Sequence, residues 1–250
     1  MPRCLPRRLE CVLELVRPCA VLADVGTDHA LLPIAAVQRG LVERAFATDM
    51  RALPLLGARE NIERSGVADR VIAVRGDGLS AIEPGAAQAV VMAGMSGDSM
   101  LRLLGAAPHV LARLEQLILQ PNQNVEQIRA WALRNGWRLR DERMIEEHGR
   151  FFVVCALAPA PGSDPAYSVP GWTNAALCSV GPWLLARSDV VALRWFERQR
   201  ERLSRWVERG VTRLQPELAL WQAACEAMHR TPSQSFGRPP AGLLEPPADP

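Results

Sequence analysis

Residues 20–40, AVLADVGTDHALLPIAAVQRG, place an apolar run, a polar turn and a helical pattern in immediate succession. The run from Ala20 to Val25 has the length of a short strand. The last two residues of this run begin the polar turn Asp24-Val25-Gly26-Thr27-Asp28-His29. A pattern typical of a helix follows from about residue 30 to residue 39 and ends at Gly40. This stretch therefore predicts a strand, a turn and a helix, the first repeat of an α/β fold.

The same alternation continues down the chain. Such short apolar runs between helical patterns are typical of parallel strands that are buried on both faces. After Gly136, two apolar segments flank His148-Gly149-Arg150 and predict an antiparallel hairpin that closes the sheet. We expect further strands at 45–48, 71–74, 89–92 and 117–119, helices at 52–64, 98–113 and 125–134, and hairpin arms at 137–146 and 151–157.

The proline-rich stretch APAPGSDPAYSVPG at 158–171 marks the predicted domain boundary, because no helix or central strand persists through it. We expect an α/β domain at 1–157, a linker at 158–171, a small α-helical domain at 172–230 and a disordered tail at 231–250. Within the helical domain, the pattern predicts one long helix over 181–214, interrupted early by Pro182, and a shorter helix over 217–229.

Composition limits the class of protein. Of the 250 residues, 48% are hydrophobic and 22% are charged, which is typical of a soluble globular protein. The net charge of +2 gives no overall argument for binding nucleic acid or a membrane surface, and no stretch approaches the roughly 20 apolar residues of a membrane span. The six cysteines are scattered and form no CxxC pair. We expect a cytoplasmic protein without a metal or a membrane contact, either a monomer or a weak dimer.

Three acids stand at the ends of successive predicted strands: Asp24, Asp49 and Asp77. In a doubly wound sheet, ligands bind at the carboxyl ends of the strands. The first turn lacks the GxGxxG pattern, so NAD is the weaker interpretation. Asp49 is placed to hold ribose hydroxyls, and Asp77 to accept from an adenine amino group. The set suits a cationic nucleoside without a diphosphate, S-adenosylmethionine (SAM); the alternative for each acid is an exposed turn or cap aspartate.

Five strings of the sequence match one family pattern in order and spacing: DVGTDHALLP (24–33), DGLSAIEPG (77–85), VVMAGMSGDSM (90–100), LILQPN (117–122) and WALRNGWRLRDERMIEEHGRFF (131–152). With these strings the sequence resembles the bacterial tRNA (adenine(22)-N1)-methyltransferases. The resemblance covers about 3–157 and, more loosely, 180–185 and the helix that follows. It implies a class I methyltransferase domain with a Rossmann-like sheet, a small coiled-coil-like helical domain, SAM as the cofactor and tRNA as the partner.

The resemblance also implies roles for individual residues. Asp28 and His29 take the catalytic position beside the methyl group. The residues implied to contact the cofactor are Asp24, Gly26, Thr27, Asp49, Met50, Asp77, Gly78, Leu79, Ala93, Gly94 and Met95. The residues implied to offer amide donors and acceptors to the substrate are Gln120, Pro121 and Asn122. Two positions depart from the family pattern: Ser96 replaces a usual glycine and would narrow the substrate site, and Phe152 replaces a more polar residue at its rim.

Ala93-Gly94-Met95 stands where class I methyltransferases that act on exocyclic amines carry an Asn-Pro-Pro-Tyr type motif. Its absence favours a ring nitrogen as the acceptor. A carboxylate at Asp28 would stabilise the cationic adenine that N1 methylation produces. The alternative for Asp28 is an N-cap of the following helix, and for His29 a packing or capping histidine. An adenine within folded tRNA must also leave its stack, and the sequence names no stacking residue.

An arginine stripe is predicted on the long helix, opposite an apolar seam of Phe196, Leu203, Val207 and Leu214. The stripe has two interpretations: it binds phosphate groups, or it is a solvated helix face. The stripe consists of Arg194, Arg198, Arg202, Arg205 and Arg209. Taken together, the sequence predicts an enzyme that methylates N1 of an adenine in tRNA. The alternatives are a methyltransferase of another RNA or small molecule, and a non-catalytic protein that binds SAM or RNA.

Overall fold

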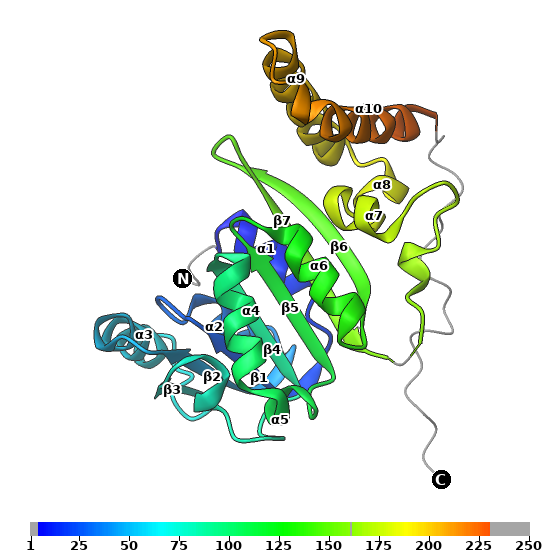
Figure 1. The fold of residues 1–250 in the computed structure, drawn as a ribbon. Helices are drawn as coiled ribbons and strands as arrows, with labels where there is room; N and C mark the ends of the chain where they lie inside the picture. Colours follow the sequence, from blue (N-terminus) through cyan, green and yellow to red (C-terminus); the bar gives the residue numbers. More distant parts are fainter. Residues whose placement is uncertain (1–4, 161, 231–250) are drawn as a thin grey trace. The chain divides into compact units, whose positions relative to one another are not determined.

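The computed structural model describes residues 5–160 and 162–230. The chain divides into two compact units, and the division falls between Ser179 and Val180. The first unit holds a seven-stranded sheet in the order β3-β2-β1-β4-β5-β7-β6 (Figure 1). Its strands are β1 (Cys19–Val25), β2 (Val42–Asp49), β3 (Val71–Arg75), β4 (Ala89–Met95), β5 (Gln116–Pro121), β6 (Trp137–Glu147) and β7 (Arg150–Pro159).

The strand directions confirm the predicted α/β class. Strands β1 to β5 are parallel, and β7 is antiparallel to both of its neighbours, β5 and β6. The turn between β6 and β7 has positive φ at both His148 (+50°) and Gly149 (+72°), the combination that suits a tight two-residue hairpin. This hairpin closes the sheet as predicted, and Arg150 already begins β7.

Helices cover both faces of the sheet, with α4 and α6 in front and α1 and α2 behind (Figure 1). The sequence analysis missed α1. It was also wrong to expect one helix over 98–113, because the chain breaks at Ala107 and Pro108 begins a separate short helix. The helices are α1 (Arg7–Glu14), α2 (Leu31–Gln38), α3 (Ala52–Arg64), α4 (Gly97–Ala106), α5 (Pro108–Leu111), α6 (Val125–Arg134) and α7 (Asn174–Val180), with 3-10 turns η1 (Gly78–Ala81) and η2 (Pro165–Tyr167).

The core of this unit lies on both sides of the central strands. All six residues of β5 are buried, as expected for a strand between two helical layers. On the side of α1 and α2, one cluster joins Val12 and Val37 from the helices to Leu22, Val91 and Phe152 from the strands. Removing these side chains from water stabilises the sheet, at about 25 cal/mol for each Å² of apolar surface.

The first unit continues past the predicted boundary at residue 157. The Asp164 carboxylate accepts hydrogen bonds from the backbone N–H of Leu139 (2.7 Å) and of Ala166 (3.0 Å), and Tyr167 is buried. The predicted linker at 158–171 is therefore partly packed against β6. A tail at 231–250 was also expected, and it lies outside the described residues.

A buried ion pair holds the end of the first unit in place. Arg129 on α6 and Glu142 on β6 are both fully buried, with Nε and Oε1 2.6 Å apart. Nη1 of Arg129 also donates to the carbonyl oxygens of Cys178 (2.7 Å) and Ser179 (3.2 Å) in α7. These contacts give a physical reason for α7 to belong with the sheet, where the sequence analysis had placed it in the helical domain.

The second unit contains α8 (Pro182–Arg187), α9 (Val190–Glu208), η3 (Thr212–Leu214) and α10 (Gln215–Arg230). One helix over 181–214 was predicted, and that prediction is wrong. Ser188 adopts a left-handed conformation (φ +48°) and Asp189 caps α9, accepting from the N–H groups of Val191 and Ala192. Pro182 begins α8 rather than interrupting a helix.

Aromatic packing holds α9 and α10 together. The ring centroids of Trp195 and Trp221 lie 4.9 Å apart, and those of Phe196 and Trp221 lie 5.2 Å apart. Both pairs are edge-on, a favourable arrangement for aromatic rings. The unit is therefore a small helical body with its own core, as expected.

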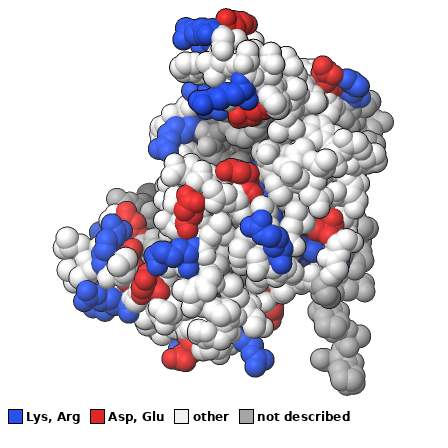
Figure 2. Space-filling model, in the orientation of Figure 1, with Lys and Arg blue, Asp and Glu red and all other residues white. Residues whose placement is uncertain are grey.

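Acidic and basic side chains are interspersed on the face shown in Figure 2, and neither sign dominates it. Within 5–160 and 162–230, no helix has the length and apolar character needed to cross a membrane. The same ranges contain no group of three or more His, Cys, Asp or Glu residues arranged to hold a metal ion.

Candidate cofactor and acceptor site

The residues predicted to contact the cofactor lie around the carboxyl edge of the parallel strands. Val25 at the end of β1 pairs with Thr48 of β2 on one side and with Met92 of β4 on the other. Asp49 in turn pairs with Arg75 at the end of β3. The strand order changes direction between β1 and β4, and such switch points are where open α/β sheets bind ligands.

The loop after β1 is closed tightly over the end of β2. The N–H groups of Gly26 and Thr27 both donate to the carbonyl oxygen of Thr48, each at 2.8 Å. Gly26 has a φ of +80°, and a Cβ at this position would overlap the methyl group of Met95. The loop therefore requires glycine for both its conformation and its contact with the end of β4.

Asp24 is a buried carboxyl group at the start of this loop. Only 7% of it is exposed. Burial raises its pKa to about 6, the hydrogen bond with Thr27 lowers it, and the charge of Asp49 raises it further. A ligand that brings positive charge to Asp24 would offset the cost of burying its ionised form.

Asp49 ends β2 with a carboxylate that is 5% exposed. Its Oδ1 accepts from the backbone N–H of Arg51 (2.7 Å) and from Nε of the same residue (3.2 Å). Oδ2 has a longer contact, 3.4 Å, with Nη2 of Arg51, and a carboxylate oxygen has room for a second hydrogen bond, such as one from a ligand hydroxyl. Met50 beside it is 59% exposed.

The loop after β3 combines one accessible acid with a buried wall. The Asp77 side chain is 53% exposed and lies 3.5 Å from Nη1 of Arg102. Gly78 has a φ of +61°, and Leu79 is buried. Asp77 is thus available at the same edge of the sheet, while Leu79 belongs to the core beneath it.

Asp28 and His29 lie in the open at the end of the first loop. Their side chains are 74% and 53% exposed, and Asp28 Oδ2 is 3.4 Å from His29 Nε2. Ala30, not Asp28, is the N-cap residue of α2, and its N–H is taken by Thr27 Oγ1. The structure therefore removes the capping alternative for Asp28 and shows His29 outside the core.

A buried side-chain amide organises the ends of β4 and β5, where the methyl acceptor is predicted to bind; we call this the acceptor edge, and the loop at Gly94 the acceptor loop. Gln120 is fully buried, and its Oε1 accepts from the backbone N–H of Gly94 (3.2 Å) and from Nη1 of Arg8 (2.5 Å). Asn122 is exposed and donates through Nδ2 to the Gly94 carbonyl (2.6 Å). Gln120 therefore does not line the mouth of the site, where the sequence analysis placed it. The exposed amide at this edge is Asn122, and Pro121 is buried.

Ser96 has a structural role that the sequence analysis did not anticipate. It is the N-cap residue of α4, and its Oγ accepts from the N–H of Ser99 at 3.1 Å. The hydroxyl is thus engaged with its own helix, a role that does not depend on narrowing the substrate site.

The arginine stripe on α9 is exposed along its whole length, from Arg194 to Arg209. On the opposite side Phe196 and Leu203 are buried and Val207 is half-buried, as expected for the apolar seam. Leu214, which was also expected in this seam, lies in η3 beyond the end of α9. Arg205 forms an ion pair with Glu201 (3.7 Å), which is the local pairing expected of a solvated face.

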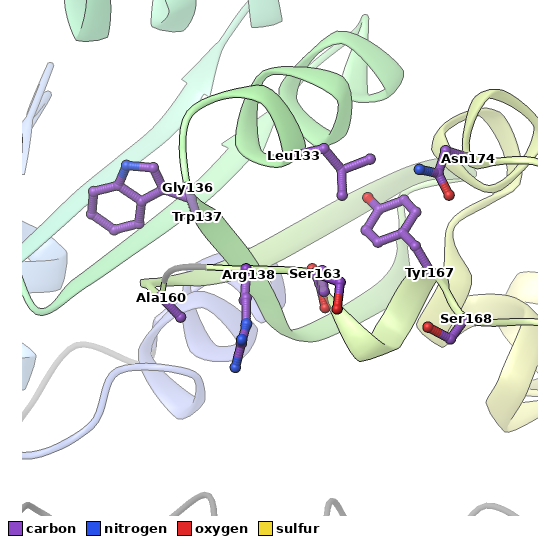
Figure 3. Close-up of a pocket in the computed structure, with 11 residues that line it drawn as sticks. Leu133, Gly136, Trp137, Arg138, Ala160, Ser163, Tyr167, Ser168 and Asn174 are labelled. Atoms are coloured by element: carbon purple, nitrogen blue, oxygen red, sulfur yellow. The ribbon is translucent and has the colours of Figure 1, made fainter.

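A cavity of about 260 Å³ lies elsewhere, between the start of β6 and the segment that follows β7 (Figure 3). Trp137 and Arg138 at the start of β6 line it, together with Tyr167. Arg138 pairs with Ala158 of β7. The preceding residue of β7, Leu157, pairs with Leu117 near the start of β5. This cavity is therefore at the opposite end of the strands from Asp24 and Asp49.

Comparison with known proteins agrees with this geometry. A family model described as "Methyltransferase domain" matches residues 5–155. The tRNA (adenine(22)-N(1))-methyltransferase of Bacillus subtilis is 37% identical over 190 residues, which cover 76% of this chain and 79% of that protein. The chain belongs to the tRNA (adenine(22)-N(1))-methyltransferase family.

Two solved structures each match 90% of this chain. The crystal structure of the B. subtilis M1A22 tRNA methyltransferase TrmK has a TM-score of 0.77 and 30% identity, over 90% of this chain and 97% of that one. Streptococcus pneumoniae Sp1610 in complex with S-adenosyl-L-methionine has a TM-score of 0.74 and 28% identity, over 90% and 98% of the two chains. The predicted methyltransferase fold with added C-terminal helices is confirmed.

Proposed function

We propose that this methyltransferase transfers the methyl group of SAM to N1 of adenine 22 in tRNA. The observation that carries the proposal is the position of Asp28. It lies beside the loop of Gly26, it is exposed, and it has no capping role in α2. A carboxylate in that position has the charge needed next to an adenine that becomes cationic.

The residues at the carboxyl edge fit SAM. The raised pKa of Asp24, caused first by burial, marks a carboxyl group that gains from a cationic ligand. Asp49 keeps an acceptor for ribose hydroxyls, and Asp77 is exposed at the edge where an adenine amino group would lie. The tight Gly26 loop brings backbone close to the ligand. Bound here, SAM supplies a methyl group activated by its sulfonium.

The protein's own contribution is alignment and electrostatics. Adenine N1 already has a lone pair, so orientation of the two reactants supplies most of the acceleration. Transfer would form the bond between N1 and the methyl group and break the bond between that methyl group and sulfur, which leaves positive charge on the adenine ring; the Asp28 carboxylate would stabilise this charge. The same carboxylate then takes the N6 proton from the cationic product. His29, 3.4 Å from Asp28, is placed to orient that carboxylate.

The arginine stripe on α9 contributes phosphate contacts in this proposal. Its five exposed guanidinium groups suit a phosphate backbone, since arginine donors match phosphate oxygens in pairs. Because tRNA is a cytoplasmic substrate, we also place the activity in the cytoplasm.

Nucleoside analysis tests the proposal directly. Purified protein is incubated with methyl-labelled SAM and total tRNA, and the tRNA is digested and separated by mass spectrometry. We expect label in 1-methyladenosine. Label in a different nucleoside would support a methyltransferase of another specificity, and SAM binding without any transfer would support a non-catalytic protein.

A further inference from the structure

Two arginines share one aromatic ring near the acceptor edge. Cζ of Arg8 lies 5.7 Å from the ring centroid of Phe152, and Cζ of Arg150 lies 5.3 Å from the same centroid. The ring is buried, Arg8 is half-buried and Arg150 is exposed. Both guanidinium groups therefore contact the same buried apolar ring, which we call the platform.

The fold brings this pair to the same edge as the acceptor loop. Arg8 comes from α1, and Arg150 begins β7 directly after the His148-Gly149 turn. Arg8 joins the platform to the end of β5, because its guanidinium lies over Phe152 while its Nη1 donates to Gln120. The platform thus lies close to the buried amide at the end of β5.

Arg8 is connected to the acceptor loop through a single buried oxygen. Its Nη1 donates to Gln120 Oε1, which also accepts from the backbone N–H of Gly94. A force or a ligand that fixes Arg8 therefore also fixes Gln120 and, through it, the loop at Gly94. This chain of contacts links α1 to the end of β4.

One acid accompanies the two arginines of the platform. Glu147 Oε1 accepts from the Arg8 backbone N–H at 3.2 Å. The pKa of Arg8 is lowered, first by burial; the charge of Glu147 raises it, and the charge of Arg150 lowers it by less than Glu147 raises it. The hydrogen bond to Glu147 uses the backbone of Arg8 and leaves its guanidinium donors for a ligand.

The free donors suit a phosphate. An arginine side chain has five N–H donors, and within the described residues the hydrogen bond from the Arg8 guanidinium is the one to Gln120. Paired arginine forks match the spacing of phosphate oxygens. When a base leaves its stack to enter an enzyme, its sugar–phosphate backbone stays at the rim.

We propose that Arg8 and Arg150 bind the phosphodiester next to the nucleotide that is methylated, and that Arg8 transmits this contact through Gln120 to the acceptor loop at Gly94. The inference rests on the proposed function, because it takes tRNA as the substrate. It names a phosphate site on the catalytic unit itself, separate from the arginine stripe on α9.

The test uses the full chain with Arg8→Gln, Arg150→Gln and the double variant. Arg143→Gln is the matched control, because Arg143 lies on the same hairpin but is paired with Glu14 at 2.7 Å. Dissociation constants for tRNA are measured by fluorescence anisotropy across a salt series, and those for SAM by calorimetry. A second tRNA carries an uncharged methylphosphonate on each side of nucleotide 22.

We expect the double variant to bind unmodified tRNA about tenfold more weakly or worse, because each substitution removes a charge-assisted hydrogen bond to the phosphate. Its salt slope should fall by roughly one to two phosphate equivalents, with SAM affinity unchanged. The tRNA with methylphosphonates should bind wild type and Arg143→Gln more weakly than unmodified tRNA does. The double variant should bind both tRNAs with the same affinity. Arg150 is exposed, so Arg150→Gln gives the single-site result even if substitution of Arg8 disturbs folding.

Two results would overturn the proposal. Either the double variant keeps the wild-type affinity and salt slope, or the methylphosphonates weaken it as much as they weaken wild type. In both cases a wild-type chain that still methylates tRNA leaves the proposed function standing. A wild-type chain that neither binds nor methylates tRNA overturns both proposals together.

Discussion

Asp49 and Arg51 form a local pair at the end of β2, in which one carboxylate oxygen accepts both the backbone N–H (2.7 Å) and the side-chain Nε (3.2 Å) of Arg51. The Asp49 side chain is 5% exposed, whereas that of Arg51 is 67% exposed. The pair therefore fixes the orientation of a carboxylate at the edge of the sheet where we propose that the cofactor binds.

Replacing Asp49 by Ala should weaken SAM binding by about 1.5 to 3 kcal/mol, because hydrogen bonds to a charged acceptor are lost. Calorimetry measures the change. Asp69→Ala is the control, since Asp69 is an exposed acid (77%) outside the site. Equal losses in the two variants, or tight binding of NAD to wild type, would contradict the assignment of Asp49 to the ribose.

Asp28→Asn should leave the fold and SAM affinity intact while slowing methyl transfer by about 10²-fold or more, because the amide keeps the shape but not the charge. Single-turnover rates with labelled SAM measure the chemical step, and calorimetry measures cofactor binding. Asp28 is 74% exposed, so little destabilisation is expected. A wild-type rate for this variant would exclude Asp28 from the mechanism.

SAM affinity should depend on pH through Asp24. Burial, with the charge of Asp49, raises the pKa of Asp24 to about 6, although the Thr27 hydrogen bond opposes the shift. Because a cationic ligand prefers the ionised carboxylate, affinity should rise with pH up to about 6 and level off above it, falling by at most about tenfold for each pH unit below.

Without SAM, the contribution of Asp24 to the stability of the folded protein should change with pH in the opposite direction. A carboxyl group whose pKa is higher in the folded than in the unfolded state contributes stability at low pH, and that contribution is lost as pH rises through about 6. Asp24→Asn should therefore flatten both pH profiles, measured by calorimetry and by urea unfolding. Profiles that keep their shape in Asp24→Asn would assign the pH dependence to another group.

Replacing Arg198, Arg202 and Arg205 by Gln should weaken tRNA binding and reduce the salt slope by up to roughly three phosphate equivalents. The buried side of α9 is untouched by these changes, so the helical unit should remain folded. The methylated base should stay the same, because contacts to phosphate groups do not read the sequence of bases. Unchanged affinity and salt slope would mean that the stripe is a solvated helix face.

The sequence predicts the parallel sheet well because each buried strand is a local apolar run, visible without any knowledge of its neighbours. The acids at the strand ends follow from that assignment. The break at Ser188 was missed because a left-handed serine has no strong sequence signal, whereas Asp189 would have been recognisable as a cap.

The acceptor edge was less predictable, since its contacts join distant parts of the chain. Arg8 and Gln120 are 112 residues apart, and the helix that positions Arg8 is only eight residues long. Burial of Gln120 depends on that helix packing over the sheet. A local pattern therefore identified Gln120 as a polar residue at a strand end but not its surroundings.

The most direct test of the central claim compares two tRNA transcripts that differ only at nucleotide 22, one with adenine and one with guanine. Each is incubated with the wild-type protein and methyl-labelled SAM, and the methylated position is mapped. The account predicts one methyl group on N1 of adenine 22 in the first transcript and none in the second. Equal methylation of both transcripts, or none in either while SAM still binds, would contradict it.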